Sequence, residues 1–229
     1  MSNTSNGKAN KGSKMQMQRI TAKKNQHILN EILSDKLIWL APIEEDNYRE
    51  YQLNNAKIIK ILGLPKGIFK GFWPSRQPQW DGIAISEKKV LYLFEAKSHL
   101  SEIQSSKSKK QELIRMRIDE VANEIAGIKP GDDCKRNLWY HNYYQIANRI
   151  VFKEKMQGLA EISTVYKKVV LVFLNFVNDT SWKDSKKMVK SSTEWEEHYI
   201  RIFKEMGIDK DSLQSRNIYI NYFDMENLV

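Results

Sequence analysis

Apolar residues recur along the chain with two kinds of spacing, and these predict both helices and strands. Helical spacing marks segments at about 25–33, 44–62, 114–128 and 136–157, and a capping-box pattern of Thr193 with Glu196 begins a further helix. Strands are predicted at about 80–86, 89–97, 169–176 and 216–223, where apolar residues are continuous or alternate. The predicted fold class is α/β, a mixed β-sheet flanked by helices. Its order is α-β-β-α-α-β-α-β from the helix at 44–62 onward.

The length and composition of the chain allow one folded domain. Of its 229 residues 41% are hydrophobic and 10% are aromatic, which is enough for one sizeable core. Residues 1–18 are mainly Ser, Asn, Gly, Lys and Gln and offer almost nothing to bury, so they are predicted to form a flexible basic tail. Residues 19–229 are then predicted to form the single domain.

Charge and cysteine content narrow the class of partner and the location. The formal net charge of +9 favours a polyanionic partner such as nucleic acid, although many soluble proteins are this basic for solubility alone. No segment approaches the roughly 20 consecutive apolar residues that a membrane helix needs. The single cysteine, Cys134, excludes an internal disulfide, and the N-terminus does not resemble a secretory signal. We therefore expect a cytoplasmic protein outside the membrane; its oligomeric state is left open.

The candidate chemistry lies at the ends of two neighbouring predicted strands. Asp81 is near the start of the strand at 80–86, and Glu95 and Lys97 end the strand at 89–97. Because strand side chains alternate between faces, Glu95 and Lys97 point to the same side. Taken singly, Asp81 is explained as a cap for backbone donors, and the other two as an ion pair that reaches water. Taken together, three charges at apolar strand ends indicate a site, and a divalent cation is their natural partner.

Three blocks of sequence carry a resemblance to a known family. They are Phe72-Trp73-Pro74 with Pro78-Gln79-Trp80-Asp81, then Glu95-Ala96-Lys97, and later Tyr144-Gln145-x-Ala147-Asn148-Arg149. The spacing of Asp81 from Glu95-Ala96-Lys97 resembles the PD-(D/E)XK nuclease superfamily, and the blocks together resemble a group of uncharacterised bacterial proteins assigned to it. The similarity runs from about residue 39 to residue 223, and Trp80 stands where the superfamily has the proline of its name.

The resemblance implies a restriction-endonuclease-like fold and a metal-dependent nuclease that hydrolyses phosphodiester bonds, in DNA rather than in RNA. Asp81 and Glu95 would hold Mg²⁺ or Mn²⁺ together with the backbone carbonyl of Ala96, and Lys97 would assist the attacking water. For Glu95→Gln in the metal-free protein, relief of the repulsion with Asp81 predicts unchanged or slightly higher stability.

A third acid is expected from the first helix of such a fold. Glu50, on the predicted helix at 44–62, is the candidate metal ligand and catalytic residue. Glu45 and Asp46 are close rivals on the same predicted helix.

The block around Gln145 predicts a polar helix face beside the site. Some nucleases of the superfamily place a Gln beside the metal with a Tyr four residues later. Gln145 matches the first position and is a candidate catalytic residue, whereas Arg149 stands at the second. Asn148 and Arg149 share this face and are candidate contacts to nucleic acid, because amide and guanidinium groups suit phosphate. An exposed polar face without function is the alternative.

Two other classes of function compete with the nuclease. One is a catalytically idle module that binds nucleic acid or protein with the same fold. The other is a structural protein stabilised by a metal ion. A complete acid-acid-Lys set argues against the idle module, because an unused buried charge cluster would only destabilise the domain.

Overall fold

The centre of the fold is a five-stranded mixed sheet. The computed structural model describes residues 7–105, 111–182 and 188–228. The strands are β1 (Leu37–Ala41), β2 (Gly82–Ser86), β3 (Val90–Lys97), β4 (Lys168–Val177) and β5 (Ile218–Asp224), and they lie side by side in that order. The first three are antiparallel, and β3, β4 and β5 are parallel. The predicted mixed sheet flanked by helices is therefore confirmed, with β1 as a strand that was not predicted.

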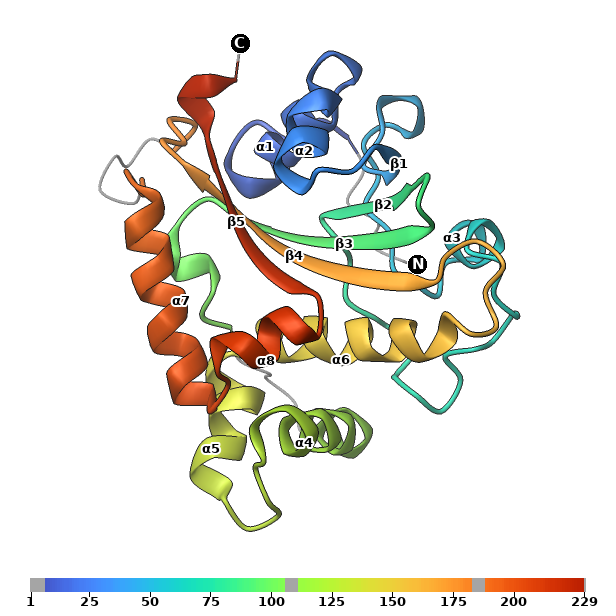
Figure 1. Ribbon diagram of the computed structural model, residues 1–229, viewed down its shortest axis with the longest axis vertical. Helices are drawn as coiled ribbons and strands as arrows, with labels where there is room; N and C mark the ends of the chain where they lie inside the picture. The colour runs from blue at the N-terminus through green and yellow to red at the C-terminus, as the bar shows by residue number, and fades with distance from the viewer. Residues whose placement is uncertain (1–6, 106–110, 183–187, 229) are drawn as a thin grey trace.

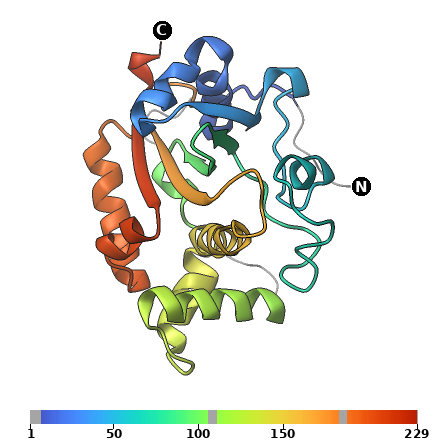
Figure 2. The same ribbon diagram turned by 45° about the vertical axis from the view of Figure 1, so that its right-hand side comes forward.

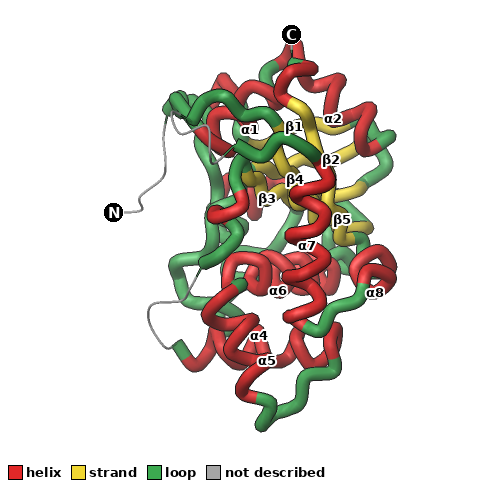
Figure 3. The backbone as a smooth tube through the Cα atoms, turned by 90° about the vertical axis from the view of Figure 1, so that its left-hand side faces the viewer, coloured by secondary structure: helices red, strands yellow, loops and turns green. Residues whose placement is uncertain are grey.

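Helices cover both faces of this sheet (Figure 1). They are α1 (Gly12–Thr21), α2 (Gln26–Leu33), α3 (Ala56–Ile61), α4 (Glu112–Ala126), α5 (Asp133–Asn137), α6 (Tyr144–Leu159), α7 (Ser192–Met206) and α8 (Lys210–Ser215). In Figures 1 and 2, α1 and α2 lie on one side of the sheet, α6 lies on the other, and α4 lies beyond α6. Figure 3 shows the same layers from the side of α7. Within the described part of the chain, no helix combines the length and apolar character needed to cross a membrane.

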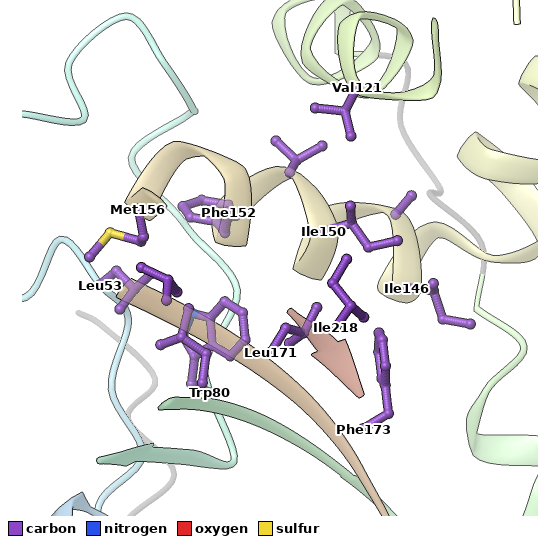
Figure 4. Packing of buried hydrophobic residues seen from close by; sticks show 14 of the residues in the cluster. Leu53, Trp80, Val121, Ile146, Ile150, Phe152, Met156, Leu171, Phe173 and Ile218 are labelled. Atoms are coloured by element: carbon purple, nitrogen blue, oxygen red, sulfur yellow. The ribbon is translucent and has the colours of Figure 1, made fainter. Parts of the chain in front are cut away.

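The alternation of side chains in β3 divides the core into two clusters. Leu91 and Leu93 belong to the larger cluster, which contains α4, α6 and α7 residues. Tyr92 and Phe94 belong to the smaller cluster, which α1 and α2 cover. Figure 4 shows the larger cluster, where Ile146, Ile150 and Phe152 of α6 pack over Leu171 and Phe173 of β4. Glu95 and Lys97 continue the series of Leu91 and Leu93, so they face the α6 side.

Helix α1 corrects the prediction of a flexible tail over residues 1–18. Residues 1–6 lie outside the described residues, but from Gly12 the chain is helical and packed. Met17 and Ile20 are buried in the smaller core cluster. The buried amide of Gln16 donates a hydrogen bond of 2.5 Å to Asp179 beyond the end of β4. Composition failed here because two apolar residues and one buried amide are enough to dock a helix against an existing sheet face.

Gly82 allows α1 to lie this close to the sheet. A Cβ at Gly82 would come within 2.8 Å of Met17 Cε and 3.1 Å of Phe94 Cβ. Such contacts are shorter than van der Waals separation, so a larger side chain at Gly82 forces the side chains of Met17 and Phe94 to shift.

We therefore expect Gly82→Val to lower the free energy of unfolding by about 1–3 kcal/mol, measured by urea denaturation. Gly158→Ala on α6 is the matched control, because an added Cβ there meets nothing within 4 Å. That control should be stabilising by about 0.5–1 kcal/mol, since alanine favours a helix interior over glycine. An unchanged urea midpoint for Gly82→Val would show that α1 does not pack closely against β2.

The predicted helix at 44–62 is wrong over most of its length. Only Ala56–Ile61 is α-helical, and its start is set by Asn55, whose side chain accepts a hydrogen bond from Lys57 N. Asn47 and Tyr48 adopt positive φ angles, which no α-helix tolerates. Tyr51 pairs with Trp80 in an isolated antiparallel bridge, and the chain then turns, with Asn55 N donating to Gln52 O, before α3 begins.

Two other helix predictions need smaller corrections. The segment predicted as one helix at 136–157 is divided into α5, a π-helical turn at Leu138–Asn142, and α6. The predicted cap of α7 is shifted, because Ser191 rather than Thr193 accepts the hydrogen bond, from Glu194 N. The helices predicted at 25–33 and 114–128 correspond to α2 and α4.

Candidate active site

The start of β2 and the end of β3 bring Asp81, Glu95 and Lys97 together. Gly82 pairs with Phe94 in the antiparallel ladder, so Asp81 lies beside Glu95. The Asp81 carboxylate accepts a hydrogen bond of 2.8 Å from the backbone N–H of Ala96. Glu95 and Lys97 point to the same side, and the Lys97 ammonium donates directly to Glu95 Oε1. The cluster therefore lies at the carboxyl end of β3, where backbone geometry alone positions it.

Arg149 of α6 holds the other oxygen of Glu95. Its Nε donates to Glu95 Oε2 at 2.5 Å, and its Nη2 donates to the backbone carbonyl of Gln79 at 2.7 Å. The guanidinium also lies 4.6 Å from the centre of the Trp80 ring, within range of a cation–π interaction. Glu95 is only 1% exposed and Arg149 only 3%. One guanidinium thus joins α6, the segment before β2 and the end of β3.

The alternative of an exposed polar face is wrong for Asn148 and Arg149. Both are buried, and Asn148 Oδ1 accepts a hydrogen bond from Arg149 at 3.1 Å. In the protein alone they hold Glu95, and their contact with nucleic acid stays a prediction. Gln145 is half-buried on the first turn of α6, with its backbone N–H donating to Ser105 Oγ at 2.9 Å. Its predicted catalytic role stays a prediction.

Glu50 reaches the site from an extended segment rather than from a helix. It precedes Tyr51, whose bridge to Trp80 places Glu50 close to Asp81. The side chain is 11% exposed, and its Oε1 lies 3.5 Å from Lys14 Nζ of α1. The charge of Glu50 also raises the pKa of Asp81, which shows that the two carboxylates interact.

The two rival acids are bound elsewhere. Glu45 is exposed and pairs with Lys23 at 2.5 Å. Asp46 pairs with Lys57 at 2.6 Å and accepts a hydrogen bond from the Tyr51 hydroxyl. Of the three candidate acids, Glu50 is therefore the one whose charge acts on Asp81.

Burial and the neighbouring charges move the pKa values of Asp81 and Glu95 in opposite directions. Burial raises the pKa of Asp81 to about 8, and the charges of Glu95 and Glu50 add to the effect, against the pull of Lys97 and Arg149. Burial also acts to raise the pKa of Glu95, but Arg149 and Lys97 outweigh it and hold that pKa below its ordinary value. Glu95 is therefore ionised, whereas Asp81 retains a proton at neutral pH in the absence of another cation.

These residues can be compared with the needs of a magnesium ion. Magnesium takes carboxylate oxygens and keeps several waters, so one or two protein carboxylates are sufficient. Asp81 takes up a proton mainly because it is buried and secondly because of the charge of Glu95, and a bound cation would oppose both effects. Among the described residues, no three His, Cys, Asp or Glu side chains are grouped closely enough to enclose a metal. Asp81 and Glu95 supply the two carboxylates that a water-rich magnesium site requires, and both oxygens of Glu95 already accept hydrogen bonds from Lys97 and Arg149.

Sequence reasoning missed two residues that contact or adjoin the cluster. Tyr199 of α7 is buried, and its pKa lies well above the ordinary value because of burial first and the charge of Glu95 second. Its hydroxyl donates to Asn175 Oδ1 at 3.0 Å. Asn175 in turn pairs with Lys97 in the parallel β3–β4 register. The available signal was Asn175 itself, an amide inside an otherwise apolar strand.

The chain after β3 connects the cluster to α1. His99 Nε2 lies 3.2 Å from Glu102, and the His99 ring packs edge-on against Trp182 at 4.7 Å between centroids. Glu102 accepts a hydrogen bond of 2.9 Å from Ser13 Oγ at the start of α1. Helix α1 is therefore fixed to the rim of the candidate site as well as to the sheet.

Comparison with known proteins adds no relative to this description. No protein-family model matches the chain, and neither a curated protein nor a solved structure matches it.

Proposed function

We propose that this protein is a metal-dependent nuclease that hydrolyses phosphodiester bonds, with DNA as the favoured substrate. The observation that carries the proposal is the convergence of Asp81, Glu95 and Lys97 at the ends of β2 and β3, with the pKa values of the two acids moved in opposite directions. Such separation of two neighbouring acids is typical of sites that handle charge and protons. Membership of the PD-(D/E)XK superfamily, and its restriction-endonuclease-like topology, belong to the same proposal.

Each residue has a definite part in this reaction. Asp81 and Glu95 would hold Mg²⁺ or Mn²⁺, with Glu50 and the Ala96 carbonyl as further oxygen donors. When bound, the ion supplies positive charge that acidifies water and stabilises the phosphate oxygens. Lys97, held rigidly at the strand end, donates a hydrogen bond that orients the attacking water and offsets negative charge developing on the phosphate. Arg149 keeps the Glu95 carboxylate in one orientation.

We expect cleavage of plasmid, linear or single-stranded DNA with Mg²⁺ or Mn²⁺ and none with a chelator. Lys97→Ala should reduce the rate by about 10²–10³-fold, because a fixed donor to the developing charge is lost. Lys89→Ala is the matched control: Glu87 and Lys89 have the same acid-x-Lys spacing but lie in the exposed β2–β3 turn. A parallel assay on RNA decides the substrate class.

Equal rates for wild type and Lys97→Ala would assign the measured cleavage to another site or to a contaminant. Rates that do not depend on the divalent ion would refute the metal-dependent mechanism.

One observation favours a second candidate, the catalytically idle binding module. Both oxygens of Glu95 are already engaged by Lys97 and Arg149, so its charge is balanced without a metal. A module of this kind binds DNA equally well with or without divalent ions and cleaves nothing. The cleavage assay with a metal-free binding control separates the two candidates.

A further inference from the structure

The docking of α1 arranges the basic residues of the N-terminal segment on one surface. Between Gly7 and Asn25 the chain carries six basic residues and no acidic one: Lys8, Lys11, Lys14, Arg19, Lys23 and Lys24. In a mobile tail these charges would have no defined position. In the folded protein, α1 is fixed by Gln16 to Asp179, by Ser13 to Glu102 and by the backbone of Gly12 to Ser181.

The charged side chains of α1 keep access to water although most of the helix is buried. Gln16, Met17 and Ile20 are buried against the sheet side, and Gln18 and Thr21 are buried as well. At 100° per residue, Lys14 lies between Thr21 and Gln18 with its side chain 28% exposed, whereas Arg19 and the N-cap residue Lys11 are exposed. Lys11 is held there by a cation–π contact of 5.2 Å with Trp182. We name Lys11, Lys14 and Arg19, with Lys8 and Lys24 beside them, the basic face.

The basic face extends from the candidate site to a groove. At one end, Lys14 Nζ lies 3.5 Å from Glu50, whose charge acts on Asp81. At the other end, Lys8, Arg19 and Lys24 line a groove of about 380 Å³ together with the amides of Gln18 and Asn25, with no acidic side chain among its described lining residues. A row of cations that leads from a groove to a carboxylate site fits a chain of phosphates better than a single anion.

We propose that the basic face of α1 binds the phosphodiester backbone of a DNA strand and leads it to the candidate active site. The part of this proposal in which the strand leads to the active site rests on the proposed function. Binding of the strand to the basic face needs no metal. Phosphate contacts position the strand, and they carry no sequence preference. The lysine nearest Glu50, Lys14, lies next to the reacting phosphate, and Lys8, Arg19 and Lys24 hold the strand farther away.

The test is a binding titration of a fluorescein-labelled duplex by the full chain, without divalent ions and at several salt concentrations. Lys11→Ala/Lys14→Ala should weaken binding at least about tenfold and reduce the slope of log K against log salt by about 0.9 per lost phosphate contact. Lys204→Ala/Lys210→Ala, on α7 and α8, removes the same charge elsewhere and should change affinity by less than about twofold. Lys11→Arg/Lys14→Arg, which keeps the charges, should restore wild-type binding.

Circular dichroism and the melting temperature verify that α1 stays folded in each variant. Equal affinity and equal salt slope for wild type and Lys11→Ala/Lys14→Ala overturn the proposal, as does the absence of binding to any oligonucleotide. A single-stranded RNA of the same length shows whether DNA is preferred over a phosphodiester backbone in general. If the wild type binds through this face but does not cleave DNA, the proposed nuclease is wrong and the role of the basic face is supported. If the wild type cleaves DNA but the Lys11→Ala/Lys14→Ala variant binds as tightly as wild type, the nuclease is supported and the role of the basic face is wrong.

Discussion

Glu95→Gln should destabilise the metal-free protein strongly, by about 3–5 kcal/mol in the free energy of unfolding. The glutamate is 1% exposed and is the shared counter-ion of Lys97 and Arg149, which are themselves buried. Glutamine keeps the shape but leaves two buried cations without their negative partner. The sequence alone predicted unchanged or higher stability through relief of repulsion with Asp81; the two ion pairs to Glu95 reverse the expected sign.

Urea denaturation of the metal-free proteins measures this effect. Glu87→Gln is the matched control, because Glu87 forms only an exposed pair with Lys36 and should change stability by less than about 1 kcal/mol. Magnesium binding to Glu95→Gln, measured by calorimetry, should fall together with cleavage. A variant as stable as wild type would show that Lys97 and Arg149 do not depend on Glu95, and unchanged magnesium affinity would remove Glu95 from the metal site.

The raised pKa of Asp81 predicts that this residue contributes less and less to the stability of the metal-free protein as pH rises from about 4 to about 8. Its pKa moves from 3.8 in the unfolded chain to about 8 in the folded one, so the folded state binds one more proton within this window. The free energy of unfolding then falls by up to about 1.4 kcal/mol per pH unit from this group. Glu95 acts in a different window: its lowered pKa contributes stability above its unfolded value of 4.5, and that stability is lost only as pH falls further.

The comparison with Asp81→Asn isolates this contribution from that of the histidines. Asparagine retains an oxygen that accepts the hydrogen bond from Ala96 N, but it cannot ionise. The difference in unfolding free energy between the two proteins should grow between pH 4 and pH 8, with the variant the more stable at pH 8. Added Mg²⁺ should stabilise the wild type at pH 8 and have little effect on the variant. A difference that stays constant with pH would mean that Asp81 is ionised throughout.

The sequence predicted those parts of the fold that local patterns determine. Strands β2 to β5 are dense apolar runs, and α4 carries an apolar stripe and ends at Gly127, which adopts a positive φ. Strand β1, in which Ile38 is 55% exposed, was missed because it lies between two segments with helical spacing and its partner β2 is more than 40 residues away in the sequence. Helix α1 was missed because its stabilising contacts are with strands far along the chain, which no local pattern reveals.

The candidate site likewise contains residues that local patterns predict and residues whose positions depend on tertiary packing. Asp81, Glu95 and Lys97 were identified because strand alternation and a hairpin determine their relative positions within a short stretch of chain. Arg149 reaches Glu95 across 54 residues, through the packing of α6 on the sheet. Helical spacing correctly placed Arg149 near the site, but its burial and its partner depend on tertiary packing. Glu50 lies near Asp81 but not on the expected helix, since the bridge between Tyr51 and Trp80 replaces that helix.

The position of α1 also affects the order in which the nascent chain can fold. Gln16 and its partner Asp179 are 163 residues apart, so at ordinary rates of synthesis roughly 10–30 s separate their appearance. During that time the surface that α1 covers, made by β3 and β4, does not yet exist. Met17 and Ile20 therefore stay uncovered while most of the chain is being made, and closing so long a loop is entropically costly. Helix α1 is synthesised before the sheet but is thus among the last elements to dock, and the basic face forms only when the sheet is complete.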